Sequence, residues 1–147
     1  MAGPCPAPAR MWVSDAMRLL PVVMALWPLQ ALAETPLTAE AFEAHVLGKT
    51  VTYSRLGSIF GIEEYLTDRQ VRWSVAPNLC QYGTWYPQDD DICFVYEGDP
   101  APHCWTFWLR DGALVAQPAD AGGSGFELKE SAASTQGLAC PGPDVGV

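Results

Sequence analysis

Hydrophobic and polar residues follow two different periods along this chain. In its first third, Phe42 and Val46 are spaced as on one face of an amphipathic helix. Thr38 is a good N-cap for that helix, and Gly48 can end it in the left-handed conformation. The pattern therefore predicts one short helix over residues 39–47.

After this helix the period changes to two, which is typical of strands with one buried face. Turn-forming Gly, Pro, Asn and Asp residues separate eight such segments. These are residues 49–55, 60–66, 70–75, 80–86, 91–96, 104–109, 113–117 and 125–129. Their short spacing without an intervening helix predicts an antiparallel meander of seven or eight strands. We expect a mainly β domain that closes into a calycin-like barrel, with a flattened sandwich as the alternative.

Alternation within the strands also assigns faces. Three sets are expected to face the core: Val71, Trp73 and Val75; Ile92, Phe94 and Tyr96; and Trp105, Phe107 and Leu109. The opposite faces would carry the remaining aromatic residues and the cysteines.

Residues 17–33 have the pattern of a secretory signal peptide. Arg18 precedes an apolar stretch, and Ala31-Leu32-Ala33 has the small-x-small form of a cleavage site. Cleavage before Glu34 would leave residues 34–147 as one domain in an oxidising compartment, either the periplasm or the exterior of the cell.

The start of the leader is open, because Met11 and Met17 could each be the first residue. The domain boundary is the same in both cases, so residues 1–33 are excluded from reasoning about the fold. Pro21 and Pro28 interrupt an apolar run that is already short for a membrane span. We expect no span in the mature chain.

Four cysteines follow the predicted cleavage site: Cys80, Cys93, Cys104 and Cys140. An even number in an exported domain predicts two disulfides, with three connectivities open. The absence of a C-x-x-C pair argues against a zinc knuckle or a thioredoxin-like motif. If the hairpin turn is Gly98–Pro100, the register can place Cys93 opposite Cys104, and Cys80 would then pair with Cys140.

Several motifs in the mature chain support a family resemblance. They are Gly83-x-Trp85-Tyr86, Ile92-Cys93-Phe94-x-Tyr96-Glu97, Asp99-Pro100-x-Pro102-x-Cys104-Trp105-x-Phe107, Gly48-Lys49-Thr50 and the C-terminal Cys140-Pro141-Gly142-Pro143-Asp144-Val145-Gly146-Val147. Together they resemble a family of small exported proteobacterial proteins of unknown function. The resemblance implies a single domain and brings no activity, because its motifs are fold-determining Cys, aromatic, Gly and Pro positions.

The chain is acidic, with 17 Asp and Glu against 8 Lys and Arg and a net charge of −9. This charge argues against nucleic acid or anionic lipid as a partner. It also favours solubility, and we expect a monomer.

No catalytic motif is found. Phe126 follows the Gly122–Gly125 segment where a nucleophile elbow would need glycine. His45 is expected on the packed helix face and His103 on an exposed turn, which does not predict a zinc site. Asp89-Asp90-Asp91 lacks the spacing of a calcium loop. We expect neither a metal nor a cofactor, and no enzymatic activity.

The aromatic residues are the remaining functional signal, because the central strands carry enough of them for both faces of a sheet. We expect one face to present Trp85 and Trp108, with Tyr82 and Tyr86, as a candidate ligand-binding surface. The alternative is that the two tryptophans flank the disulfide and the N-terminal helix.

Three hypotheses for the function follow. The first is a non-enzymatic binding module that takes a small apolar ligand or an envelope protein on its aromatic face. The second is an envelope hydrolase inhibitor or stress protein that acts through the Pro-containing loop at residues 97–103. The third and weakest is an enzyme of unrecognised type that uses the acids at residues 89–91.

Overall fold

The computed structural model describes residues 34–121 and 125–140, together with Met1 and Gly3. Except for those two residues, the expected signal peptide lies outside the described residues. The Gly122–Ser124 segment and the last seven residues also lie outside them. Within the part described, no helix has the length and apolar character needed to cross a membrane.

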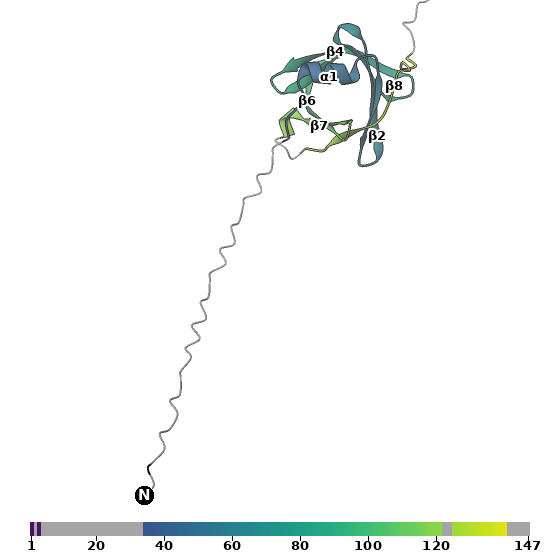
Figure 1. Cartoon of the computed structure of the whole chain (residues 1–147). Helices are drawn as coiled ribbons and strands as arrows, with labels where there is room; N and C mark the ends of the chain where they lie inside the picture. Colours follow the sequence, from purple (N-terminus) through teal and green to yellow (C-terminus); the bar gives the residue numbers. More distant parts are fainter. Residues whose placement is uncertain (2, 4–33, 122–124, 141–147) are drawn as a thin grey trace, which may run out of the picture. The chain divides into compact units, whose positions relative to one another are not determined.

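In the described part of the chain, one α-helix precedes eight strands, which pair antiparallel in chain order (Figure 1). The elements are α1 (Ala39–Val46), β1 (Thr50–Arg55), β2 (Ser58–Tyr65), β3 (Gln70–Ala76), β4 (Leu79–Gln88), β5 (Asp91–Tyr96), β6 (Asp99–Arg110), β7 (Ala113–Pro118) and β8 (Leu128–Ser134), with short 3-10 turns at Thr67–Arg69 and Ala119–Ala121. Pairing of β8 with β1 closes the barrel. The predicted mainly β meander is confirmed as a barrel, and the sandwich alternative is wrong.

Two strand boundaries differ from the prediction by five residues: the end of β8, which is Ser134 rather than residue 129, and the start of β6 in the β5–β6 hairpin. The sequence predicts a strand that begins at residue 104, whereas β6 begins at Asp99 and runs through Pro100 and Pro102. The turn falls at Gly98, whose φ of +83° suits glycine in a tight turn. The pairing with β5 is irregular between Phe94 and Tyr96, and such irregular positions tolerate proline in a sheet.

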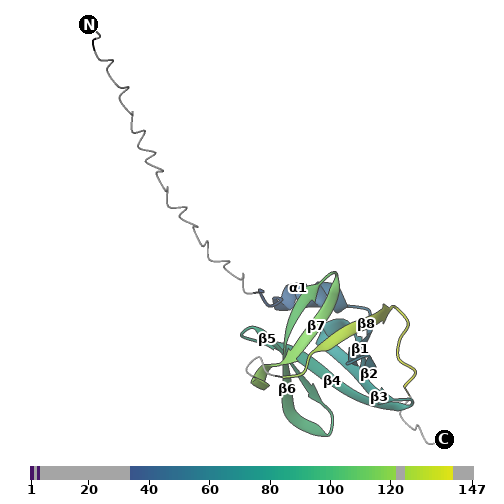
Figure 2. The same ribbon diagram turned by 90° about the horizontal axis from the view of Figure 1, so that it is seen from below.

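Helix α1 closes one end of the barrel. Thr38 caps the helix, since its Oγ1 accepts a hydrogen bond from the amide of Ala41 at 3.2 Å. Phe42 is fully buried, and its ring lies 4.6 to 6.5 Å from four other aromatic ring centroids, those of Tyr65, Trp85, Phe94 and Phe107. Figure 2 shows α1 across one end of the strands. The apolar face of the helix thus packs into this end of the barrel and fills its core.

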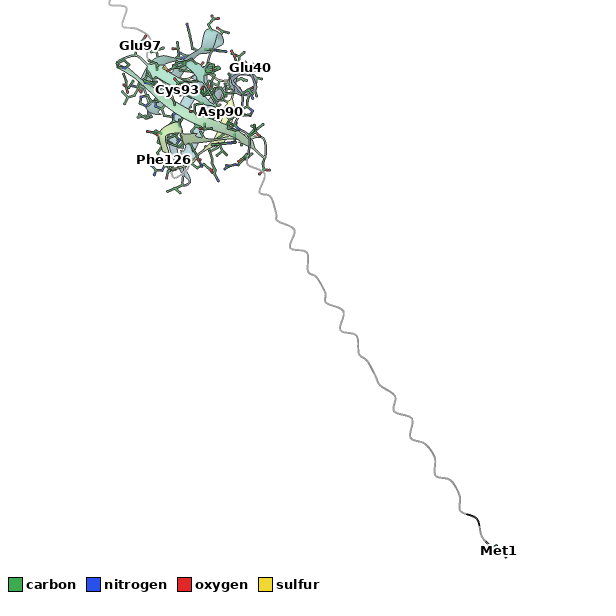
Figure 3. All side chains as sticks on the ribbon, turned by 90° about the vertical axis from the view of Figure 1, so that its left-hand side faces the viewer. Met1, Glu40, Asp90, Cys93, Glu97 and Phe126 are labelled. Atoms are coloured by element: carbon green, nitrogen blue, oxygen red, sulfur yellow. A yellow bond between two sulfur atoms is a disulfide. The ribbon has the colours of Figure 1, made fainter. Side chains whose placement is uncertain are left out.

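The two ends of the barrel differ in their connections. The β2–β3, β4–β5 and β6–β7 connections share the α1 end, and the other four hairpins share the opposite end. Figure 3 shows this for β5: Asp90 precedes it on the side of Glu40 in α1, and Glu97 follows it on the side of Phe126. The predicted core positions Val75 and Leu109 are 64% and 45% exposed. Assigning them to the core was wrong, because each lies near a barrel end, beyond the packed interior.

Both expected disulfides are present. Cys93 on β5 pairs with Cys104 directly opposite on β6. Cys80 on β4 is bonded to Cys140, which attaches the C-terminal segment to the barrel.

Gly137 and Leu138, just before Cys140, contact an ion pair between β2 and β3. Arg72 Nη2 is 2.6 Å from Glu64 Oε2, which also accepts a hydrogen bond from the amide of Leu138 at 2.9 Å. A Cβ at Gly137 would lie 2.9 Å from the Glu64 carboxylate. The Cys80–Cys140 disulfide therefore holds in place a segment that covers the largely buried Glu64–Arg72 pair and donates a hydrogen bond to it.

Candidate ligand-binding site

A cavity of about 280 Å³ lies inside the barrel. Its lining residues come from all eight strands: Tyr53, Phe60, Glu63, Trp73, Val75, Gln81, Phe94, Tyr96, Asp99, His103, Trp105, Phe107, Ala116 and Leu128. We refer to this space as the barrel cavity. Val75, Asp99 and His103 place one side of it at the barrel end opposite α1. The alternation of side chains along each strand brings these residues together inside a closed sheet.

An aromatic group forms one wall of the barrel cavity. Phe60 packs against Trp73 and Trp105, with ring centroids 6.0 and 6.4 Å apart. Phe126 extends this group toward the surface, and the Arg55 guanidinium lies 4.0 Å above its ring centroid. Such a wall provides apolar surface and negative ring faces.

Gly61 explains how the Trp73 indole fits. A Cβ at residue 61 would lie 2.2 Å from two atoms of that indole, so any side chain there would displace the ring. The indole therefore rests against bare backbone on the inner surface of β2. This close approach requires glycine.

A buried carboxyl group lies among the apolar residues of the cavity wall. Glu63 is 3% exposed, and its Oε2 accepts a hydrogen bond from the Tyr96 hydroxyl at 2.9 Å. Its other oxygen, Oε1, is buried and has no hydrogen-bond partner within residues 34–121 and 125–140. Burial raises the pKa of Glu63 to about 8, and the bond from Tyr96 opposes this only in part. The group is therefore mainly neutral at pH 7 and ionises near pH 8.

The phenols around Glu63 stay neutral. Burial raises the pKa values of Tyr53, Tyr65 and Tyr96 above the usual value for tyrosine, and nearby acidic groups contribute to the shift. The Tyr53 and Tyr65 hydroxyls share a hydrogen bond of 2.8 Å. These side chains can donate or accept hydrogen bonds, but they bring no charge to the cavity.

The two histidines lie at opposite ends of the barrel. On α1, His45 Nε2 is 2.9 Å from Glu130 Oε2, as expected for a satisfied side chain on the packed face. At the cavity rim, His103 Nε2 is 2.9 Å from Asp99 Oδ2, and both side chains are exposed. The bonds from His103 and from the amide of Ala101 lower the pKa of Asp99. The rim therefore carries a carboxylate.

The raised pKa of Glu63 predicts how stability depends on pH. In the unfolded chain this carboxyl ionises near 4.5, whereas the folded protein keeps the proton up to about 8. The penalty for ionising it is absent below pH 4.5 and grows as pH rises toward 8, by at most about 1.4 kcal/mol per pH unit. We expect Glu63→Gln to gain stability relative to the wild type over this range.

Urea unfolding of both proteins at pH 5 and pH 8 measures this effect as a difference of differences. The pH dependence of stability that comes from groups present in both proteins cancels in that comparison. Equal stability differences at the two pH values would contradict the raised pKa.

The four aromatic residues proposed from the sequence do not line the barrel cavity. Trp85 is buried in the core, 5.3 Å from Phe42 between ring centroids, so the prediction that it lies on a non-core face was wrong. Trp108 Nε1 donates to the Glu34 carbonyl on the outside of the barrel. Tyr82 and Tyr86 are also outward and partly exposed. Ligand binding by these four residues stays an untested prediction.

The sequence reasoning missed Glu63 and assigned Trp73 and Trp105 only to a filled core. Glu63 and Glu64 are adjacent, so period-two alternation shows that one of them faces inward without showing which. The two side chains have different surroundings: Glu64 forms an ion pair with Arg72, and Glu63 lines the cavity. Gly61 and Tyr65 share the phase of Glu63, whereas Ile62 shares that of Glu64, so the sequence alone does not decide between the two.

No family model, curated protein or solved structure matches this chain. Among residues 34–121 and 125–140, no three His, Cys, Asp or Glu side chains gather as a metal site would require. Asp89–Asp91 lie at the β4–β5 connection on the α1 end, away from the rim of the cavity.

Proposed function

We propose that this chain is an exported, non-enzymatic binding protein that holds one small, mainly apolar ligand in the barrel cavity. The supporting observation is the cavity itself, whose wall is mainly apolar and partly aromatic and includes several polar side chains, as in small-molecule sites. Two disulfides fit an oxidising compartment, in agreement with the leader-like sequence at residues 17–33.

The volume limits the size of the ligand. Small-molecule sites span roughly 300–1,000 Å³, and an apolar cavity of roughly 150 Å³ holds benzene. At about 280 Å³, the barrel cavity suits one ring, or a short chain, with a small substituent.

Titration with toluene, benzyl alcohol and benzylamine tests this proposal. Trp73 and Trp105 line the cavity, so binding there is expected to change the intrinsic fluorescence. A ligand of about eight non-hydrogen atoms is expected to bind with a Kd on the order of 0.1–1 mM.

A pair of matched variants locates the binding. Ala116 is 1% exposed and lines the cavity, whereas Ala132 is exposed on β8. Ala116→Leu is expected to fill the space and weaken binding at least tenfold, and Ala132→Leu to leave the Kd within about twofold. Circular dichroism checks that both variants fold. The proposal fails if the folded wild-type protein binds none of the three compounds, or if the two variants bind equally well.

A further inference from the structure

The carboxyl group of Glu63, which lines the cavity, has one oxygen without a hydrogen bond among the described residues. Buried polar atoms in proteins are nearly always hydrogen-bonded, so an unpaired one in a residue that lines a cavity lacks a partner that a ligand could supply. Glu63 Oε2 is occupied by the Tyr96 hydroxyl, and Oε1 is buried with no partner among the residues that the structure describes. A ligand that donates a hydrogen bond to Oε1 would complete this carboxyl group.

The charges around the cavity favour a cation as that donor. None of the lining residues is Lys or Arg. Besides Glu63, the groups that can carry charge are Asp99 and His103 at the rim, which pair with each other. Glu130 on β8 is already bound to His45 and to the amide of Leu114. An anionic ligand would face the Glu63 carboxyl group with no Lys or Arg on the wall, because the one basic lining residue, His103, already pairs with Asp99.

The aromatic wall points to the same ligand chemistry. Phe60, Trp73 and Trp105 present rings to the cavity, and ring faces attract cations, most strongly on Trp. The whole chain has a net charge of −9, which favours the approach of positive ligands.

We propose that the barrel cavity selects a small organic cation, an amine on an aromatic or short aliphatic body, and that its ammonium group donates a hydrogen bond to Glu63 Oε1. This inference rests on the proposed function and specifies its ligand class. Tyr96 acts as a positioning residue, since its hydroxyl holds the carboxyl group from the other side.

Binding of the cation is expected to depend on pH. The pKa of Glu63 is about 8 without ligand, so ammonium binding near neutral pH favours loss of its proton. The groups that face Glu63 are Tyr53, Tyr65 and Tyr96, whose pKa values are all raised. At the rim, Asp99 stays ionised and pairs with His103. Affinity for a protonated amine should therefore rise between pH 6 and pH 8.

Three probes that share a benzyl body test the proposal. Calorimetric titration with benzylamine, benzyl alcohol and benzoate at pH 6 and pH 8 compares a cation, a neutral donor and an anion. Benzylamine is expected to bind at least tenfold more tightly than benzyl alcohol at pH 8, and benzoate more weakly than either. Its affinity should rise severalfold from pH 6 to pH 8.

Two carboxyl-to-amide variants identify the group responsible. Glu63→Gln keeps the shape of the side chain and an acceptor for Tyr96, and it is expected to remove both the tenfold preference for benzylamine and the pH dependence. Glu97→Gln removes an exposed carboxylate at the same end of the barrel and is expected to change neither (Figure 3).

The outcomes separate this inference from the proposed function. Equal binding of benzylamine and benzyl alcohol, both lost in Ala116→Leu, would overturn the choice of a cation and retain the cavity as a binding site. A preference for benzylamine that survives Glu63→Gln would overturn the role of Glu63. Failure of every probe to bind the folded wild-type protein would overturn both proposals.

Discussion

Replacing Phe42 by alanine is expected to lower the free energy of unfolding by about 3–5 kcal/mol. The side chain is fully buried and contacts rings from β2, β4, β5 and β6. Its loss removes apolar burial and leaves a space that the closed barrel fills poorly, because hydrogen bonds between all neighbouring strands fix the diameter of the barrel. The expected loss is a large part of the 5–15 kcal/mol typical of a domain.

Equilibrium urea unfolding, followed by far-UV circular dichroism, measures this loss. Leu47→Ala is the matched control, because Leu47 directly follows the same helix but is 48% exposed. We expect that change to cost less than about 1 kcal/mol. Similar losses in the two variants would show that α1 does not fill the core at its end of the barrel.

Removing the Cys80–Cys140 bond by alanine substitution of both residues is expected to cost about 4 kcal/mol. This bond joins residues 60 positions apart, and the entropy that a cross-link removes from the unfolded chain increases with loop length. The 11-residue separation of Cys93 and Cys104 corresponds to about 3 kcal/mol in the same treatment. Releasing the C-terminal segment also frees the Leu138 amide from Glu64.

Urea unfolding of the wild type and the double variant, with and without dithiothreitol, separates the cross-link from the packing of the sulfur atoms. Under reducing conditions neither protein has the bond, and we expect their stabilities to differ by less than about 1 kcal/mol. A difference of about 4 kcal/mol that persists after reduction would assign the effect to side-chain packing. Hydrogen exchange at Leu138 is expected to accelerate in the variant.

Several features could be predicted from the sequence because their causes are local. The helix at residues 39–47 follows from the Thr38 cap and the spacing of Phe42 and Val46, and it is observed as Ala39–Val46. The strands follow from period-two alternation, and the Cys93–Cys104 pair follows from hairpin register. Neighbouring residues within one or two elements determine each of these features.

The cavity could not be predicted in this way, because its wall combines one or a few side chains from every strand. Alternation shows that Trp73 and Trp105 face inward, but whether the interior is filled depends on how far α1 enters the barrel and on the volume left at the other end. The same limit led to the error at Trp85, whose ring packs against Phe42 of α1, a contact between distant elements.

The sequence by itself therefore determined the order and type of the elements, the acidic charge and the number of disulfides, since short-range pattern and composition specify them. Only the tertiary structure decided that the sheet closes into a barrel, that α1 plugs one end, and that Glu63 rather than Glu64 enters the cavity. The physical reason is that adjacent residues of a strand point to opposite faces, and only closure of the ring makes one of those faces an interior.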